Sequence, residues 1–381
     1  MTSTLTAPIA ETARPARWRS RAAVVVATAG IAAVLAAPAP HRDPATAPGP
    51  GPSGPPALAE RWPSARPFAI PATLPGGLSY SPELILGPAL TAGLATSADQ
   101  LHLSVAIARP SGRARILQTD VPGLASFDAL TASGGSLFWM RTRTDESGQQ
   151  HTSLWTASLT GSGPPRQLAA NAGTPEFGGT RYSLQAESGR LHWTGSNTDG
   201  GPATTLYSIP VTGGRVTTRA IPGAWQLSAW PWLTTPPSPV PTVTLLNAVT
   251  GQRVAVRAPK ARITVCDPAW CRISAGDSAQ PQDTTLMHPD GSASRRIATG
   301  GTTAISDEVA LEGRFEPLGG TIDPNAVTAA TALTLYDLRT GRTTMVDPAA
   351  TEARASGDYL WWSSGDNETR AWHGLDLRTL H

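Results

Sequence analysis

The chain has 381 residues, of which 40% are hydrophobic and 15% charged, and it contains 37 Gly and 36 Pro. This composition offers enough apolar residues for a core and many turn formers, as is typical of an all-β protein. The formal net charge of +2 arises in residues 1–21, which carry +3 by themselves and leave the remainder near −1. A near-neutral remainder provides no basic stripe, so nucleic acid is excluded as a partner.

The N-terminal region has the pattern of a membrane-targeting segment. Residues 1–21 form a basic tail with four arginines, and an apolar stretch follows at residues 22–37. Cleavage by a signal peptidase is disfavoured because Pro38 and Pro40 follow the small-residue positions. We therefore expect a single transmembrane anchor with the tail in the cytoplasm and the remainder outside the cell membrane. Secretion after signal cleavage is the alternative.

Residues 38–66 are predicted to be a disordered linker, because they are rich in Pro and Gly and contain few large apolar residues. Within them, Gly49, Gly51 and Gly54 match a dinucleotide-binding pattern. The match is rejected, since that motif requires a strand before it and a helix after it. Residues 67–381 are expected to form one extracytoplasmic domain.

A strand, a tight turn with Gly and a second strand recur six times after the linker. Gly permits the positive φ that tight turns need, and the flanking β-branched residues suit strands. The six copies are residues 103–117, 154–168, 206–220, 243–256, 285–297 and 333–346. Residues 372–381 resemble a truncated seventh copy.

The spacing of the turn glycines, roughly 40 to 50 residues, is typical of four-stranded β-propeller blades. We predict seven blades, with six or eight as alternatives. The expected blades are residues 80–119, 127–170, 182–221, 224–258, 262–299, 304–346 and 354–381, and the sixth contains a longer excursion at 316–325. The last blade lacks a fourth strand, so residues 68–74 are predicted to close the ring, with 84–90 as the alternative.

Tryptophan is abundant, with 12 copies, most of them in the predicted strands. Packing between blades is the favoured interpretation, because large aromatic side chains fill the wedge between adjacent sheets. The strongest candidates for a stacking surface instead are Trp225, Trp230 and Trp232, because they lie close together in a Pro-bounded segment.

The only two cysteines, Cys266 and Cys271, bracket a short turn that begins with Asp-Pro. Opposed residues on antiparallel strands lie close enough for a disulfide, and an oxidising compartment favours one. A structural disulfide is therefore predicted. A zinc site is the rival, but the pair lacks further ligands nearby in sequence.

No nucleophile elbow, zinc-protease motif or P-loop is present, and the seven His show no metal-ligand spacing. Asp366 and Glu368 could bind a cation, although residues 365–367 are typical of a hairpin turn, which is the favoured reading. No catalytic, cofactor-binding or metal-binding residue is predicted, although a site dispersed around the channel would escape this search.

Four segments form a distinctive set: the Arg-rich start with its anchor, residues 223–232, the Cys266/Cys271 pair in its Asp-Pro-Ala-Trp turn, and residues 360–369. Together they resemble the TolB-like β-propeller proteins of actinobacterial cell envelopes. The resemblance spans residues 67–381. It implies a membrane-anchored or secreted propeller and supplies no catalytic residue.

The resulting hypothesis is a non-enzymatic binding or scaffold module for an envelope protein or a wall component. The alternative is a propeller enzyme or small-ligand-binding protein, quinoprotein-like or lyase-like, with a dispersed site at the channel mouth. Convergent acidic or His side chains at the channel would favour the alternative, and a shallow apolar face would favour the scaffold.

Overall fold

The computed structural model describes residues 54–177, 181–196, 203–236, 242–257, 263–275, 283–299, 302–306, 308–320, 330–366 and 368–381. The predicted basic tail, the predicted anchor and the first part of the predicted linker lie outside these ranges. Within them, no helix is long and apolar enough to cross a membrane.

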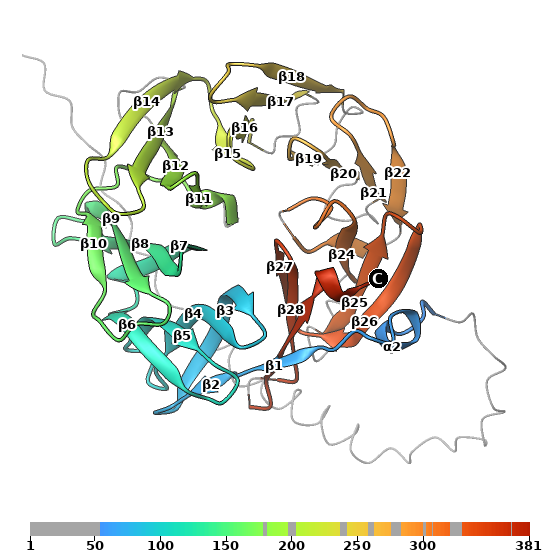
Figure 1. The fold of residues 1–381 in the computed structure, drawn as a ribbon, viewed down its shortest axis with the longest axis horizontal. Helices are drawn as coiled ribbons and strands as arrows, with labels where there is room; N and C mark the ends of the chain where they lie inside the picture. The colour runs from blue at the N-terminus through green and yellow to red at the C-terminus, as the bar shows by residue number, and fades with distance from the viewer. Residues whose placement is uncertain are drawn as a thin grey trace, which may run out of the picture. The chain divides into compact units, whose positions relative to one another are not determined.

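The unit from Gly54 to His381 contains seven antiparallel sheets that follow one another around a ring (Figure 1). This arrangement is a seven-bladed β-propeller, as predicted. The first blade has five strands: β2 (Thr73–Leu74), β3 (Leu78–Gly87), β4 (Leu90–Thr96), β5 (Leu103–Ala108) and β6 (Ala114–Asp120). The second has β7 (Ala125–Ser133), β8 (Ser136–Thr144), β9 (Gln150–Ser158) and β10 (Arg166–Ala169).

Blades three to five each have four strands. The third contains β11 (Gln185–Glu187), β12 (Arg190–Ser196), β13 (Ala203–Pro210) and β14 (Thr217–Pro222), and a short 3-10 helix, η1 (Arg181–Ser183), precedes it. The fourth contains β15 (Gln226–Leu227), β16 (Trp232–Thr234), β17 (Thr242–Asn247) and β18 (Arg253–Arg257). The fifth contains β19 (Ile263–Cys266), β20 (Cys271–Ala275), β21 (Asp283–Met287) and β22 (Arg295–Ala298).

The last two blades complete the ring. The sixth contains β23 (Thr302–Ala304), β24 (Phe315–Gly320), β25 (Thr331–Asp337) and β26 (Arg342–Ala350). The seventh contains β27 (Glu352–Ser356), β28 (Tyr359–Ser364), β29 (Ala371–Asp376) and the N-terminal strand β1 (Phe68–Ile70). A short 3-10 helix, η2 (Leu377–Thr379), ends the chain.

The six predicted hairpins are confirmed, and each forms the last two strands of a blade, from β5–β6 to β25–β26. At five of the six turns the glycine has a positive φ, for example 76° at Gly251 and 87° at Gly291. Gly161 differs, because its turn is held by the side chain of Ser158, whose Oγ accepts the Gly161 N–H at 2.9 Å.

Ring closure by an N-terminal strand is also confirmed, with a narrower range than predicted. Phe68, Ala69 and Ile70 pair with Gly374, His373 and Trp372 of β29. Thr73 and Leu74 instead pair with the start of β3 in the first blade. The alternative closing segment, residues 84–90, is wrong, because it belongs to β3 and to the start of β4.

The end of the predicted linker folds against the sixth blade. Helix α2 (Leu58–Arg61) buries Leu58, and the next residue, Trp62, meets Phe315 edge to face with ring centroids 5.9 Å apart. The Met345 N–H donates to the Pro56 carbonyl at 2.8 Å. The linker prediction is therefore wrong for this stretch, since one Leu and one Trp suffice to bury it against a neighbouring apolar cluster.

The predicted excursion in the sixth blade is wrong for residues 316–320, which belong to β24. Residues 316–319 pair with β25, and Gly320 pairs with Thr302 of β23. This stretch contains Pro317, Gly319 and Gly320, and because Pro and Gly normally weaken a strand, it does not look like one in the sequence. Residues 321–325 lie outside the described ranges.

Candidate functional site

A cavity of 510 Å³ lies among the innermost strands of the propeller. Strands β3, β7 and β27, which border the central space in Figure 1, contribute to its lining, and so do η1 and the segment after β23. We call it the channel cavity. Its charged lining residues are Glu83, Asp128, Glu308 and Arg354.

A β-bulge directs Glu83 toward this cavity. The register between β3 and β4 shifts between Pro82 and Leu84, so that Glu83 is the extra residue. The bulge lies directly over Gly93 on β4, where an added Cβ would come within 2.1 Å of the Ser81 carbonyl oxygen. On the other side, the Trp361 indole N–H donates to the Pro82 carbonyl at 3.0 Å and so ties the bulge to the last blade.

Arg354 on β27 connects the first and the last blade across the cavity wall. Its Nη1 donates to Glu83 Oε2 in a very short contact, and its Nη2 lies 2.7 Å from Glu352 Oε1. Burial by itself would lower the pKa of Arg354, but Glu83 and then Glu352 outweigh it and raise the pKa above its ordinary value. The guanidinium therefore remains charged and holds Glu83 in place.

Glu308 is almost fully buried beside the same cavity, with 6% of its surface exposed. Its two carboxylate oxygens accept the Gly357 N–H at 3.0 and 3.1 Å, and its own N–H donates to Ser306 Oγ at 3.1 Å. Backbone donors of this kind stabilise a carboxylate in a fixed orientation. Glu308 thus joins the sixth blade to the turn after β27.

Asp128 reaches the cavity from the second blade at another irregular position. The register between β7 and β8 shifts between Asp128 and Thr131, and Ala129 has a φ of 53°. The Asp128 carboxylate is half-buried and accepts a hydrogen bond from Ser126 Oγ at 2.7 Å. Two innermost strands are therefore distorted where they present a carboxylate to the channel.

The charge balance of the channel cavity is negative. Three carboxylates face one guanidinium, and that guanidinium is already bound by Glu83 and Glu352. A concave, partly desolvated surface focuses such a field and attracts cationic groups. Among the described residues, no cluster of three or more His, Cys, Asp or Glu side chains could hold a metal ion.

A second cavity of 150 Å³ lies next to the channel cavity, and Ser183 of η1 lines both. We call it the side cavity. Most of its lining is polar and uncharged and comes from blades three to five, including Gln226, Ser228 and Thr264. Val265 and Val309 add apolar contacts.

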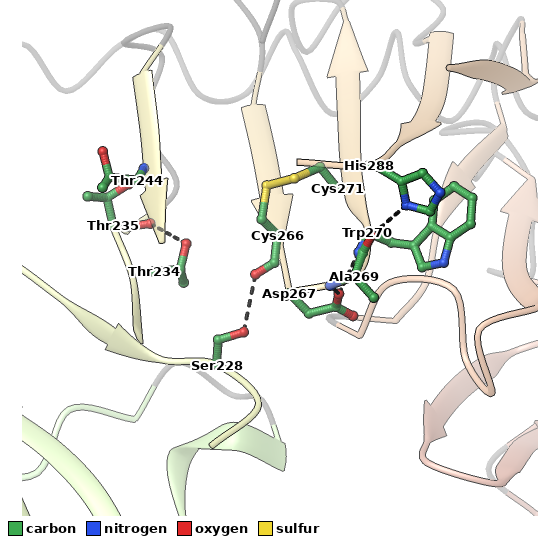
Figure 2. The surroundings of a disulfide bond; sticks show 10 residues. All are labelled: Ser228, Thr234, Thr235, Thr244, Cys266, Asp267, Ala269, Trp270, Cys271 and His288. Atoms are coloured by element: carbon green, nitrogen blue, oxygen red, sulfur yellow. Dashed lines mark hydrogen bonds between the residues drawn. A yellow bond between two sulfur atoms is a disulfide. The ribbon is translucent and has the colours of Figure 1, made fainter. Parts of the chain in front are cut away.

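The predicted disulfide borders the side cavity. Cys266 and Cys271 face each other on β19 and β20 and are bonded, with Cα atoms 4.1 Å apart (Figure 2). Asp267 begins the turn, and its Oδ1 accepts the N–H groups of Ala269 at 2.7 Å and Trp270 at 2.6 Å. Ser228 of the fourth blade donates to the Cys266 carbonyl at 3.2 Å (Figure 2). The disulfide is confirmed, and this hairpin joins blades four and five.

Asp366 forms a turn between β28 and β29, as the favoured interpretation predicts. Its Oδ1 accepts the N–H groups of Glu368 and Thr369, both at 2.9 Å, and the Thr369 hydroxyl at 2.8 Å. The hydrogen bond from the Thr369 backbone, followed by that from its side chain, holds the pKa of Asp366 below its ordinary value, although desolvation acts in the opposite direction. This geometry is that of an Asx turn.

The three tryptophans proposed as a stacking surface do not act together. Trp225 is buried and donates to the Pro222 carbonyl at 2.8 Å. Trp230 stacks on His192 with ring centroids 3.6 Å apart, and Trp232 packs against a core cluster of blades four and five. The core interpretation also holds for Trp139, Trp193, Trp361, Trp362 and Trp372, which are at most 3% exposed.

The channel residues were not predicted from the sequence. Glu83 and Asp128 occur within strands that read as ordinary β segments, and Glu308 and Arg354 are more than 200 residues from Glu83 in the chain. A Pro-Glu pair inside a strand was the one usable signal, since Pro in a strand often marks an irregularity.

The fold and the site define a seven-bladed β-propeller with a charged central cavity. No protein-family model matches the chain, and no curated protein is similar to it at a significant level. Solved structures are similar in fold. An uncharacterized protein from Listeria monocytogenes has a TM-score of 0.51 at 8% identity, covering 81% of this chain and 94% of that one.

Two further similar structures have lower scores. The β-propeller domain of the Trilobed protease from Pyrococcus furiosus has a TM-score of 0.44 at 10% identity, covering 65% of this chain and 82% of that one. TolB from Acinetobacter baumannii has a TM-score of 0.34 at 10% identity, covering 75% of this chain and 79% of that one. At these identities the likeness concerns the fold alone.

Proposed function

We propose that this chain is a non-enzymatic binding module of the cell envelope, anchored by residues 22–37, whose channel cavity takes up a cationic group of an envelope protein. The observation that carries the proposal is the excess of carboxylates in that cavity. Asp128 contributes most to recognition, because Glu83 is already paired with Arg354 and Glu308 with the Gly357 N–H.

The cavity suits a lysine or arginine side chain presented by a partner segment. Its volume of 510 Å³ falls in the range of small-molecule and peptide side-chain sites. A charge-assisted hydrogen bond to a partly buried carboxylate contributes more than a neutral one. A channel site with three carboxylates also supports the second candidate, an enzyme acting on a cationic substrate.

The test uses the purified full-length chain and a five-residue peptide with a central arginine, compared with the same peptide carrying glutamate. Calorimetry should detect binding of the arginine peptide only, with an affinity that falls as salt is added. Asp128→Asn should weaken that binding about tenfold, which corresponds to about 1.4 kcal/mol. Asp366→Asn makes the same charge change in the turn between β28 and β29, outside the cavity lining, and should not change peptide binding.

Equal binding of the two peptides, or an unchanged affinity in Asp128→Asn, would refute the cationic channel site. Mass spectrometry of the peptide after incubation separates the two candidate functions. An intact peptide supports the binding module, and a cleaved or modified peptide supports the enzyme. Retention of the chain in the membrane fraction after a salt wash tests the anchor.

A further inference from the structure

Two residues that line the side cavity have polar groups that the protein itself leaves unsatisfied. The Ser183 and Thr264 hydroxyls are both buried without a hydrogen-bond partner, and their residues are 8% and 2% exposed. Ser183 comes from η1 before the third blade, whereas Thr264 comes from β19 of the fifth. An unmade hydrogen bond on a buried hydroxyl costs about 1–3 kcal/mol, so two such groups around one cavity point to a molecule that fills it.

The size of the cavity admits more than a single water. A buried water requires about 10–15 Å³ of such volume. Since one water takes up about 30 Å³ in the liquid, the 150 Å³ side cavity has room for about five waters. A cavity of about 150 Å³ can hold a benzene molecule, so the side cavity admits one six-membered ring.

The charges around the side cavity exclude an anion. No Lys, Arg or His lines it, whereas Glu176 and Asp267 do. A phosphate or carboxylate would thus meet like charges and no cationic partner.

The hydroxyls favour a neutral ligand over a cation. Glu176 and Asp267 would attract a cation, but a cation could bind Ser183 and Thr264 only through their oxygens and would itself satisfy neither hydroxyl hydrogen. One oxygen of Asp267 already accepts two backbone N–H groups. Hydroxyl groups on a ligand donate and accept, and so satisfy Ser183 and Thr264 completely. The apolar Leu227 and Val309 supply contacts for the C–H faces of such a ligand.

We propose that the side cavity is a binding site for a neutral polyol of monosaccharide size. The ligand would lie between Ser183 and Thr264, with Gln226 as a third polar partner. The site does not use the channel carboxylates, so sugar binding here can be tested separately from peptide binding in the channel cavity.

The experiment compares sugars that share a ring and differ in charge. Glucose, galactose, arabinose and N-acetylglucosamine serve as neutral probes, and glucosamine and glucuronate serve as charged counterparts. Each is titrated at millimolar concentrations into the full-length chain, with saturation-transfer NMR and the melting temperature as readouts. At least one neutral sugar should bind saturably and raise the melting temperature, and glucuronate should not bind.

Single-atom variants locate the site. Ser183→Ala and Thr264→Val should each weaken the neutral sugar about five- to tenfold, because each removes one hydrogen bond. Neither variant should lower the stability of the free protein, since the deleted hydroxyls have no partner there. Thr344→Val is the matched control, because its hydroxyl is also buried and unpartnered but Thr344 does not line the side cavity. Asp128→Asn should leave sugar binding intact.

Three outcomes would overturn the proposal. The first is that none of the neutral sugars binds, so that only water fills the cavity. The second is tighter binding of glucosamine than of glucose, which would identify a cation site. The third is an equal loss of sugar affinity in Thr344→Val and Thr264→Val, which would place the effect outside the cavity.

Discussion

His192 shows how burial alters the chemistry of a single residue in this propeller. It is 4% exposed on β12, stacks on Trp230 and has no partner for Nδ1. Burial, and then the positive charge of Arg190, lower its pKa from 6.5 to about 4. The folded protein therefore holds His192 neutral where the unfolded chain would bind a proton.

This difference in pKa predicts a pH dependence of stability. Between pH 6.5 and 4 the unfolded state binds more protons, so the free energy of unfolding falls as the pH falls, by about 3 kcal/mol for this residue. His192→Phe keeps a ring against Trp230 and cannot be protonated. Between pH 6.5 and 4, the free energy of unfolding of this variant should therefore fall by about 3 kcal/mol less than that of the unaltered protein. Urea unfolding at several pH values measures the difference.

The exposed His102 offers the control for that measurement. His102→Phe should follow the pH profile of the unaltered protein. Parallel profiles for His192→Phe and the unaltered protein would show that His192 is protonated in the fold and would refute the argument.

At the scale of one element, the β19–β20 hairpin is fixed by a disulfide across five positions of the chain. Closing so short a loop restricts the unfolded chain modestly, and the loop-entropy relation gives about 2 kcal/mol. Cys266→Ser with Cys271→Ser should therefore lower the melting temperature by about 3 °C, because the unfolding entropy of a unit of this size is large. Calorimetry measures this change.

Thiol labelling of the unfolded chain checks the bond itself. No thiol should react before reduction and two should react after it. An equal melting temperature for the double variant and the unaltered protein would contradict this prediction. It would mean that the Asp267 turn and the hydrogen bond from Ser228 stabilise the hairpin without the disulfide.

At the scale of the whole molecule, the chain ends are joined through β1. Ile70 is 4% exposed and packs with Tyr80, Trp361 and Trp372, which belong to the first and the last blade. The indole N–H of Trp372 also donates to the Tyr80 carbonyl at 3.1 Å. A three-residue strand therefore closes a ring that would otherwise leave the edge of β29 unpaired.

Ile70→Asp should open this closure, because it places an unpaired charge in an apolar cluster at a cost of several kcal/mol. The melting temperature should fall by roughly 10 °C, and amides of β29 should exchange faster with solvent. Ala69→Asp places the same charge one residue earlier on the exposed face of β1 and should change stability by less than about 0.5 kcal/mol. Equal effects of the two substitutions would contradict closure through β1.

Local chemistry made much of the fold predictable. Six hairpins, seven blades and the disulfide follow from Gly in tight turns, from β-branched strands at a regular period and from two cysteines across a short turn. The errors concern residues whose environment is set by distant parts of the chain. Leu58 and Trp62 fold because Phe315 and its neighbours offer an apolar surface, and Pro317 remains in a strand because β25 pairs with it.

The amino-acid sequence alone thus determined the class of this protein, since the period, the turns and the missing last strand are properties of segments that are short in the chain. The tertiary structure alone decided the candidate sites. The channel carboxylates and Arg354 meet because ring closure brings the first and the last blade together, and Ser183 and Thr264 share one cavity because blades three to five converge there. Spatial proximity between residues so far apart in the chain arises only when the sheets assemble, because no local pattern encodes it.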